Sequence, residues 1–182
     1  SVPSLWRLGF DQIYIGQPSL DVRRRPDGRI EVAGLDLLAD TPTEESPSAA
    51  MDWFFSQSEF VIRSGTVRWT DDLKQQSPVT LEQVDLVVRN PGRQHLLRLD
   101  ATPEGGLAGR ISMQGVFRSP FLTLHPGKLS DWRGTAYVNM PEVDLAKMAS
   151  PTHLTDQLGL KVSHGRGALR LWLDMNAGQL TG

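Results

Sequence analysis

Hydrophobic and polar residues alternate with a period of two along most of this chain. The alternation is most regular over residues 79–90, 97–101, 110–118, 132–140 and 169–175. In a β-strand, a period of two places successive side chains on opposite faces. Turn-forming residues recur roughly every ten residues between these runs, as in an all-β sheet. The pattern predicts a mainly β chain, folded as an antiparallel meander with one apolar and one polar face.

Residues 59–72 contain two short β-prone runs that flank a Ser64-Gly65 pair. β-branched and aromatic residues fit strands, and a Ser-Gly pair between such runs is a turn signal. We therefore expect either a tight β-hairpin or a single, sharply bulged strand. The stretch ends on Asp71-Asp72, which we interpret as a solvated strand end. Neighbouring strand residues point to opposite faces, so these carboxylates are not expected to converge on one ligand.

A second hairpin is predicted at Pro26-Asp27-Gly28, where proline presets one φ angle and glycine accepts a positive one. Alternating runs, 20–22 and 30–32, lie on the two sides of this turn. A short strand is expected at 35–37. We interpret the neighbouring run Arg23-Arg24-Arg25 as a solvated hairpin tip, with contact to anionic lipid headgroups or nucleic acid as the alternative.

Helical patterns are few and short. Residues 39–50 combine two prolines with small polar residues and two adjacent glutamates, which predicts a flexible, solvated loop. A short helix is expected over 48–57, with an apolar face that seats it against the sheet. That face consists of Met51, Phe54 and Phe55. Further short helical segments are expected over 144–149, with Asp144 as the cap, and over 153–160.

Composition and charge narrow the function classes. The chain has 182 residues, enough for one sizeable core, and we expect a single β-rich segment over 1–182. Both ends run into strand-like sequence, so we interpret the chain as a fragment of a longer, repetitive protein. The formal net charge is −2, so no overall basic field indicates nucleic-acid binding. Cysteine is absent, which excludes disulfides, thiolate metal sites and cysteine nucleophiles.

Residues that carry enzyme chemistry are scattered. The four histidines stand singly, none at a metal-ligand spacing, and we expect surface or loop positions for all of them. They are His95, His125, His153 and His164. Gly165-Arg166-Gly167 lacks the lysine of a phosphate loop, so we interpret it as a strand-entry turn. We therefore expect no catalytic residues, no metal and no cofactor, and a protein that is not an enzyme.

Several stretches together resemble the AsmA-like family of Gram-negative envelope proteins, and its large YhdP members most of all. Each stretch is a strand with a turn. Their order and combination carry the resemblance, which runs from about residue 8 to the end of the chain. The stretches are PSLDVRRRPDGRIEVAGL (18–35), WFFSQSEFVIRSGTVRWTDD (53–72), LEQVDLVVRN (81–90), LLRLDATPEG (96–105), WRGTAYVNMPEVDL (132–145) and GRGALRLWLD (165–174).

The resemblance implies a protein that is anchored in the inner membrane by an N-terminal helix and projects into the periplasm. Its repeated β-sheet curls into a groove or half-barrel with an apolar lining. Such proteins resemble bridge-type carriers that move phospholipid between the inner and outer membranes and support the outer-membrane permeability barrier. The implied partners are phospholipid acyl chains, neighbouring segments of the same polypeptide and other envelope proteins. The resemblance supplies no catalytic residues.

The alternation itself also indicates a binding face. Short helices and few aromatic residues leave little to cover the apolar side of so long a sheet, and an uncovered apolar strip marks an interaction site. Acyl chains suit such a strip because apolar burial is non-directional and contributes about 0.8 kcal/mol per CH₂ group. The residues expected to line it are Phe60, Ile62, Val67, Trp69, Val84, Leu86, Val88, Ile111, Met113 and Phe117.

Three alternatives stay open at this point. The apolar face belongs to an ordinary sandwich core, or the chain is a scaffold module that docks partner proteins through open sheet edges. The third alternative is a glycan-processing enzyme or a carbohydrate-binding β-domain. Trp69 and Trp132 lie on apolar faces of their predicted strands, which favours packing over stacking on sugars.

Overall fold

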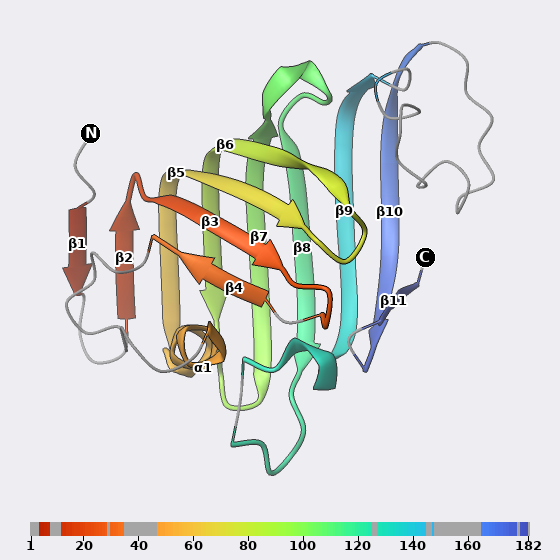
Figure 1. Cartoon of the computed structure of the whole chain (residues 1–182). Helices are drawn as coiled ribbons and strands as arrows, with labels where there is room; N and C mark the ends of the chain where they lie inside the picture. Colours follow the sequence, from red (N-terminus) through yellow and green to blue (C-terminus); the bar gives the residue numbers. More distant parts are fainter. Residues whose placement is uncertain are drawn as a thin grey trace.

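The chain forms one curved β-sheet with one described α-helix in this computed structural model (Figure 1). The described residues are 4–7, 12–28, 30–34, 47–124, 127–144, 147, 165–177 and 179–181. The sheet has eleven strands, and two short 3₁₀ turns, η1 (Glu104–Gly106) and η2 (Leu129–Asp131), accompany it. The prediction of a mainly β, curved and open sheet with few short helices is confirmed.

Strand order follows chain order over most of the sheet. The strands are β1 (Ser4–Arg7), β2 (Gln12–Gly16), β3 (Ser19–Arg24), β4 (Ile30–Ala33), β5 (Glu59–Asp71), β6 (Gln76–Arg89), β7 (Gln94–Pro103), β8 (Ile111–Arg118), β9 (Arg133–Asp144), β10 (Arg166–Asn176) and β11 (Gln179–Thr181). Their order in the sheet is β1-β2-β5-β6-β7-β8-β9-β10-β11. From β5 onward every neighbouring pair is antiparallel, as the alternating pattern predicts.

Two pairings depart from the predicted antiparallel arrangement. β2 and β3 both lie parallel to β5, one after the other along the same edge of that strand. β3 also forms the predicted hairpin with β4, through a turn in which Gly28 has a φ of 85°. A parallel pair requires a long crossover, and the segment that contains α1 (Pro47–Ser56) provides it. The period of two is the same for both strand directions, so alternation alone does not distinguish them.

The sheet bends sharply along a line that crosses neighbouring strands. Ser64 in β5 has a φ of 53°, Gln83 in β6 has a φ of 50°, and Gln17, between β2 and β3, has a φ of 55°. Residues other than glycine seldom adopt such left-handed values. The strand register shifts beside Ser64 and beside Gln83, as at β-bulges. The hairpin alternative for 59–72 is therefore wrong and the bulged strand is confirmed, because β5 runs continuously through the bulge.

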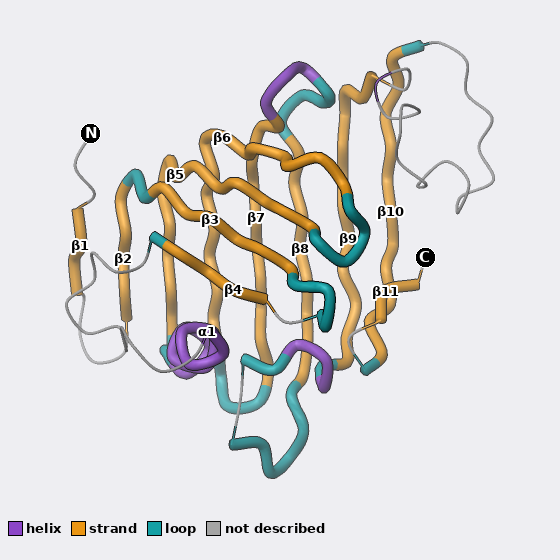
Figure 2. The backbone as a smooth tube through the Cα atoms, in the orientation of Figure 1, coloured by secondary structure: helices purple, strands orange, loops and turns teal. Residues whose placement is uncertain are grey.

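Beyond the bend, part of the sheet folds over its own face. Residues 19–24, 30–33, 65–71 and 76–83 cross in front of β7 and β8 (Figures 1 and 2). They form β3, β4 and the adjoining parts of β5 and β6. We call this second layer the arch. The face of the sheet that it covers is the inner face, and the opposite face is the outer face. α1 lies below the arch against the same inner face.

Polar contacts hold the bend in place. Oδ1 of Asp85 accepts a hydrogen bond from the backbone N–H of Ser64 at 3.1 Å. Arg110 donates from Nη2 to Oδ2 of Asp85 at 2.7 Å, and from Nη1 to the carbonyl oxygen of Gln83 at 3.0 Å. Backbone groups at the two bulges therefore find side-chain partners where the regular ladder is interrupted.

The arginine run and the acidic pair meet at the end of the arch. Each arginine of the run forms an ion pair: Arg23 with Asp72 at 3.2 Å, Arg24 with Asp71, and Arg25 with Glu31 at 2.7 Å. Asp71 is only 4% exposed. Burial raises the pKa of its carboxyl group, but hydrogen bonds from Arg24 and from the Lys74 N–H outweigh burial and lower that pKa below its ordinary value. The predicted solvated positions are wrong for Arg24 and Asp71, because the register of β3 and β5 makes them direct neighbours.

α1 matches the helix expected over 48–57 to within one residue at each end, so the last residues of the loop expected over 39–50 are helical. Phe54 and Phe55 pack against the core cluster, as predicted. The ring centroids of Phe54 and Phe60 lie 4.0 Å apart. Aromatic packing therefore seats α1 on the inner face.

Four expectations fall wholly or partly outside the described residues. They are the loop at 39–46, the strand at 35–37 and the helices at 144–149 and 153–160. At the start of the first of these helices, the N–H of Lys147 donates a hydrogen bond to Oδ1 of Asp144 at 3.2 Å. This contact has the pattern of the predicted helix cap.

Two glycines allow the ring of Phe117 to lie against the inner face. A Cβ atom at Gly115 would lie 2.4 Å from that ring, and one at Gly134 would lie 2.1 Å from the carbonyl oxygen of Val116. Phe117 itself is buried in the core cluster. The glycines in these strands are therefore packing positions, where a side chain would displace the ring or the neighbouring strand.

We predict that Asp85→Ala lowers the free energy of unfolding by about 0.5–1.5 kcal/mol, because the Ser64 N–H and the Arg110 guanidinium both lose their acceptor at solvent-exposed contacts. Urea unfolding monitored by circular dichroism measures the change. Glu82→Ala is the matched control, since Glu82 is an exposed acidic residue three positions earlier in β6. Equal stability of the two variants would show that Asp85 does not hold the bend.

Candidate functional site

Alternate residues of each strand point to the inner face. One row of register partners consists of Phe60, Val88, Leu97, Gly115 and Ala136 in β5 to β9. The next row consists of Leu86, Leu99, Met113, Val138 and Leu171 in β6 to β10. Register partners lie on the same face, so each row is continuous across five strands. We call the second row the inner strip.

The two rows differ in exposure. Four residues of the first row are buried and Leu97 is half-buried, whereas all five residues of the inner strip are half-buried. With strands about 4.8 Å apart, the inner strip spans about 19 Å across the sheet. The inner face is therefore a closed core on one side and a partly open apolar surface on the other.

The structure places all ten residues expected to line a binding face on this inner side of the sheet or arch. Five of them are buried: Phe60, Ile62, Val84, Val88 and Phe117. The other five are half-buried: Val67, Trp69, Leu86, Ile111 and Met113. The first group belongs to the core side of the inner face, where α1 and the bend cover the sheet. In the second group, Leu86 and Met113 belong to the inner strip, Ile111 lies in the same strand as Met113, and Val67 and Trp69 lie on the arch.

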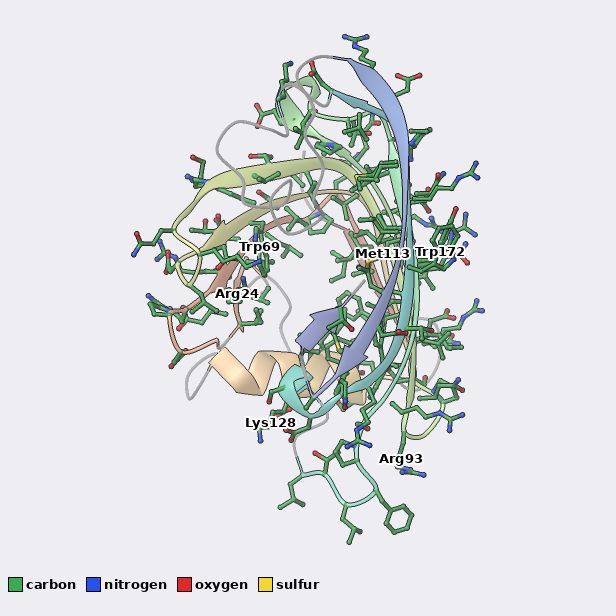
Figure 3. The ribbon with its side chains drawn as sticks, turned by 90° about the vertical axis from the view of Figure 1, so that its right-hand side faces the viewer. Arg24, Trp69, Arg93, Met113, Lys128 and Trp172 are labelled. Carbon is green, nitrogen blue, oxygen red and sulfur yellow. The ribbon has the colours of Figure 1, made fainter. Side chains whose placement is uncertain are left out.

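The arch and the sheet face each other across the interior. Figure 3 shows Trp69 on the arch and Met113 on β8 pointing toward one another from opposite walls, while Trp172 points away on the outer face. The register pairs Val22 with Trp69 and Arg24 with Asp71 in the arch. The Arg24–Asp71 ion pair therefore lies next to the apolar wall, and its two charges compensate each other.

Sequence reasoning missed three residues of the inner strip: Leu99, Val138 and Leu171. Each follows the period-two alternation of its own strand, which is the available signal. Their alignment with Leu86 and Met113 depends on the register between strands, and bulges in β5 and β6 shift that register. A single sequence does not show where such shifts occur.

His95 was expected at the surface, and this prediction is wrong. The side chain is 1% exposed and its ring stacks on Trp132, with centroids 4.2 Å apart and planes inclined by 2°. Nδ1 lies 2.7 Å from Oδ1 of Asn90, and Nε2 is buried without a hydrogen-bond partner among the described residues. Burial lowers the pKa of His95 to about 4. His95, Leu97 and Leu99 are alternate residues of β7, so their side chains point to the same apolar face. This alternation indicates the burial of His95 in the sequence.

The outer face carries ion pairs together with the exposed apolar side chains of Val116 and Trp172. Arg89 pairs with Glu59 at 2.6 Å and Arg98 with Asp100 at 3.2 Å. A shallow hollow of about 1020 Å³ on this face does not include the inner strip; its lining includes Arg63, Asp85, Arg98, Tyr137 and Trp172. Ion pairs on this face agree with the predicted polar side of the sheet.

No group of three or more His, Cys, Asp or Glu side chains is arranged to hold a metal ion in the part of the chain that the structure describes. No described helix is both long enough and apolar enough to cross a membrane. His125, His153 and His164 lie outside the described residues.

We predict that His95 makes the fold sensitive to mild acid. Its pKa falls from an ordinary 6.5 to about 4 on folding, so the unfolded chain binds the proton more tightly. The free energy of unfolding should therefore decrease as pH falls from about 6.5 to about 4, by at most about 3 kcal/mol. His95→Phe keeps a ring beside Trp132 but does not titrate. Urea unfolding at several pH values should give a flatter slope for this variant, and identical slopes would contradict the prediction.

Comparison with known protein families matches the chain over residues 3–182 to the family described as YhdP protein. No curated protein and no solved structure gives a significant match. The matched range covers almost all of the 182 residues. The chain therefore belongs to the YhdP family.

Proposed function

We propose that this chain is a non-enzymatic, lipid-binding segment whose inner strip receives the acyl chains of phospholipid. Membership of the YhdP family indicates an envelope protein of the AsmA-like group. Within that group, we infer that this chain is a periplasmic part of a protein anchored in the inner membrane. That protein would form a bridge that moves phospholipid between the inner and outer membranes and supports the outer-membrane barrier. The observation that carries the proposal is the continuous, half-buried apolar row across β6 to β10.

The chemistry of the inner strip suits an alkyl chain. Its five side chains are aliphatic or thioether groups without hydrogen-bonding requirements. Apolar burial is non-directional, so an acyl chain can shift along such a surface without breaking specific bonds. The neighbouring charges, Arg24 and Asp71, compensate each other. A surface of this kind holds an acyl chain without fixing it at one point.

The direction of the inner strip also favours a role in a longer structure. The strip runs across the strands, so each strand added at the β10 side would lengthen it by about 4.8 Å. Neighbouring segments of the same polypeptide are the partners that we propose for this extension. A path made in this way grows with strand number and requires no special residue at the junctions.

A second candidate function, a scaffold that docks partners through a sheet edge, rests on β10. β11 pairs only with Asp174, Met175 and Asn176 of β10. Within the described residues, the edge of β10 that faces away from β9 has no strand partner from Arg166 to Leu173. Unpaired backbone groups of this kind bind an added strand. The same edge could serve the extension of the sheet.

The lipid proposal is tested by purifying the chain from a Gram-negative host under mild conditions and measuring co-purified phospholipid by mass spectrometry. Leu86→Asp and Met113→Asp should each reduce bound lipid at least about tenfold, because a carboxylate on the inner strip is costly to bury beside an acyl chain. Val116→Asp is the matched control. It lies in the same strand as Met113 but on the outer face, where it is 43% exposed, and it should retain lipid.

Folding of each variant is checked by circular dichroism and by its urea midpoint, so that loss of lipid is compared only among folded proteins. Photo-crosslinking residues placed at positions 99 and 113 provide an independent readout in cells. Absence of lipid from the unaltered protein, together with no lipid adduct at either position, would contradict the proposal. Equal loss in the inner-face and outer-face variants would also contradict it.

A further inference from the structure

The loop after β8 exposes a cluster of large apolar side chains. Phe121 is 75% exposed, Leu122 is 87% exposed and Leu124 is 89% exposed. Figure 3 shows this loop at the lower end of the molecule, extending beyond Arg93 and Lys128. Such neighbouring apolar residues on a protruding loop mark a contact surface rather than part of the core. We call Phe121, Leu122 and Leu124 the apolar tip.

The stem of this loop is held firmly although its tip is exposed. The N–H of Ser119 donates to the carbonyl oxygen of Arg93 at 3.0 Å, and Ser119 is buried. On the other side, the N–H of Gly127 donates to Oδ1 of Asp52 in α1 at 2.8 Å. These anchors fix the base of the loop to the turn before β7 and to α1. The tip is therefore presented away from the core by two defined hydrogen bonds.

Cations surround the base of the loop. Arg118 and Arg133 are register partners at the ends of β8 and β9, and the guanidinium of Arg93 lies 5.0 Å from the ring centroid of Phe121. Lys128 is exposed and pairs with Asp131 at 3.1 Å. The described residues that contact the base of the loop or line its hollow include four cations, Arg93, Arg118, Lys128 and Arg133, and two carboxylates, Asp52 and Asp131. Cations therefore outnumber carboxylates among these residues.

A hollow beside the loop places two of these cations together. Its volume is about 580 Å³, and its lining includes Arg118, Arg133, Ser119 and Asp131. Two guanidinium groups and a hydroxyl group offer hydrogen-bond donors to an anionic oxygen, with one carboxylate opposing them. The hollow has room for an anionic headgroup next to the apolar tip.

We propose that this loop docks the protein onto the surface of a bilayer that contains anionic lipid. The apolar tip enters the acyl region, while Arg93, Arg118, Lys128 and Arg133 remain at the level of the phosphates. Apolar residues below a set of cations form the pattern that binds the anionic interface of a membrane. This inference does not rest on the proposed function of the inner strip, because the loop and the strip are different surfaces.

The absence of cysteine permits a direct test with single labelled positions. Leu122→Cys, carrying an environment-sensitive fluorophore, is mixed with vesicles of phosphatidylcholine alone or with about one-third phosphatidylglycerol. We expect a blue shift and quenching by spin labels in the acyl region with the anionic vesicles. Leu73→Cys is the matched control, because Leu73 is an exposed leucine in the turn between β5 and β6. Its label should show neither change.

A second measurement uses flotation with the same anionic vesicles. The triple variant Phe121→Ser, Leu122→Ser, Leu124→Ser should partition at least tenfold more weakly than the unaltered protein, while Leu73→Ser should partition normally. The replaced side chains are exposed, so both variants should retain the unaltered urea midpoint. Lipid that co-purifies with the triple variant should be unchanged, which separates failure of this inference from failure of the inner-strip proposal.

Three outcomes would overturn the inference. One is unchanged flotation of the triple variant, and another is no flotation of any protein together with no blue shift at position 122. The third is a concentration-dependent dimer that the triple variant abolishes, without vesicle binding, which would assign the apolar tip to a second copy of the chain. A shift of equal size with neutral and anionic vesicles would remove the role of the four cations.

Discussion

The bend across β2–β3, β5 and β6 is the constraint on which the rest of the structure depends. A regular antiparallel meander would leave one extended sheet with its apolar face open to water. Left-handed residues at Ser64 and Gln83 interrupt that regularity and turn the strand ends over the sheet. Such conformations are unfavourable for residues with a side chain. The contacts of Asp85 and Arg110 offset this cost by satisfying the backbone at both bulges.

The bend divides one apolar face into two regions with different properties. On the core side, α1 and the rings of Phe60, His95 and Trp132 form a packed core. Toward β10, the same alternation continues into side chains that stay half-buried. A core residue and a binding residue can therefore have the same sequence pattern. Their difference lies in what the bend and α1 cover, and this is why the inner strip is the candidate site while Phe60 is not.

Charged side chains are paired so that little net charge lies next to the apolar interior. The arginine run is neutralised by Asp71, Asp72 and Glu31, and the outer-face arginines are largely matched by neighbouring carboxylates. The lower end of the molecule differs, because cations there outnumber carboxylates beside the exposed loop after β8. An apolar interior with compensated charges suits uncharged chains, whereas an apolar loop with excess cations suits an anionic surface.

The sequence by itself determined the β class, the meander from β5 onward, the hairpin of β3 and β4, the position of α1 and the apolar face of the long strands from β5 to β10. These features depend on local periodicity and turn chemistry, which neighbouring residues specify. Only the tertiary structure decided the parallel pairing of β2 and β3 with β5, the burial of His95 and Asp71, and the alignment of Leu99, Val138 and Leu171 in one row. Those features depend on inter-strand register and on which surface folds over which, and contacts between residues distant in the sequence set both.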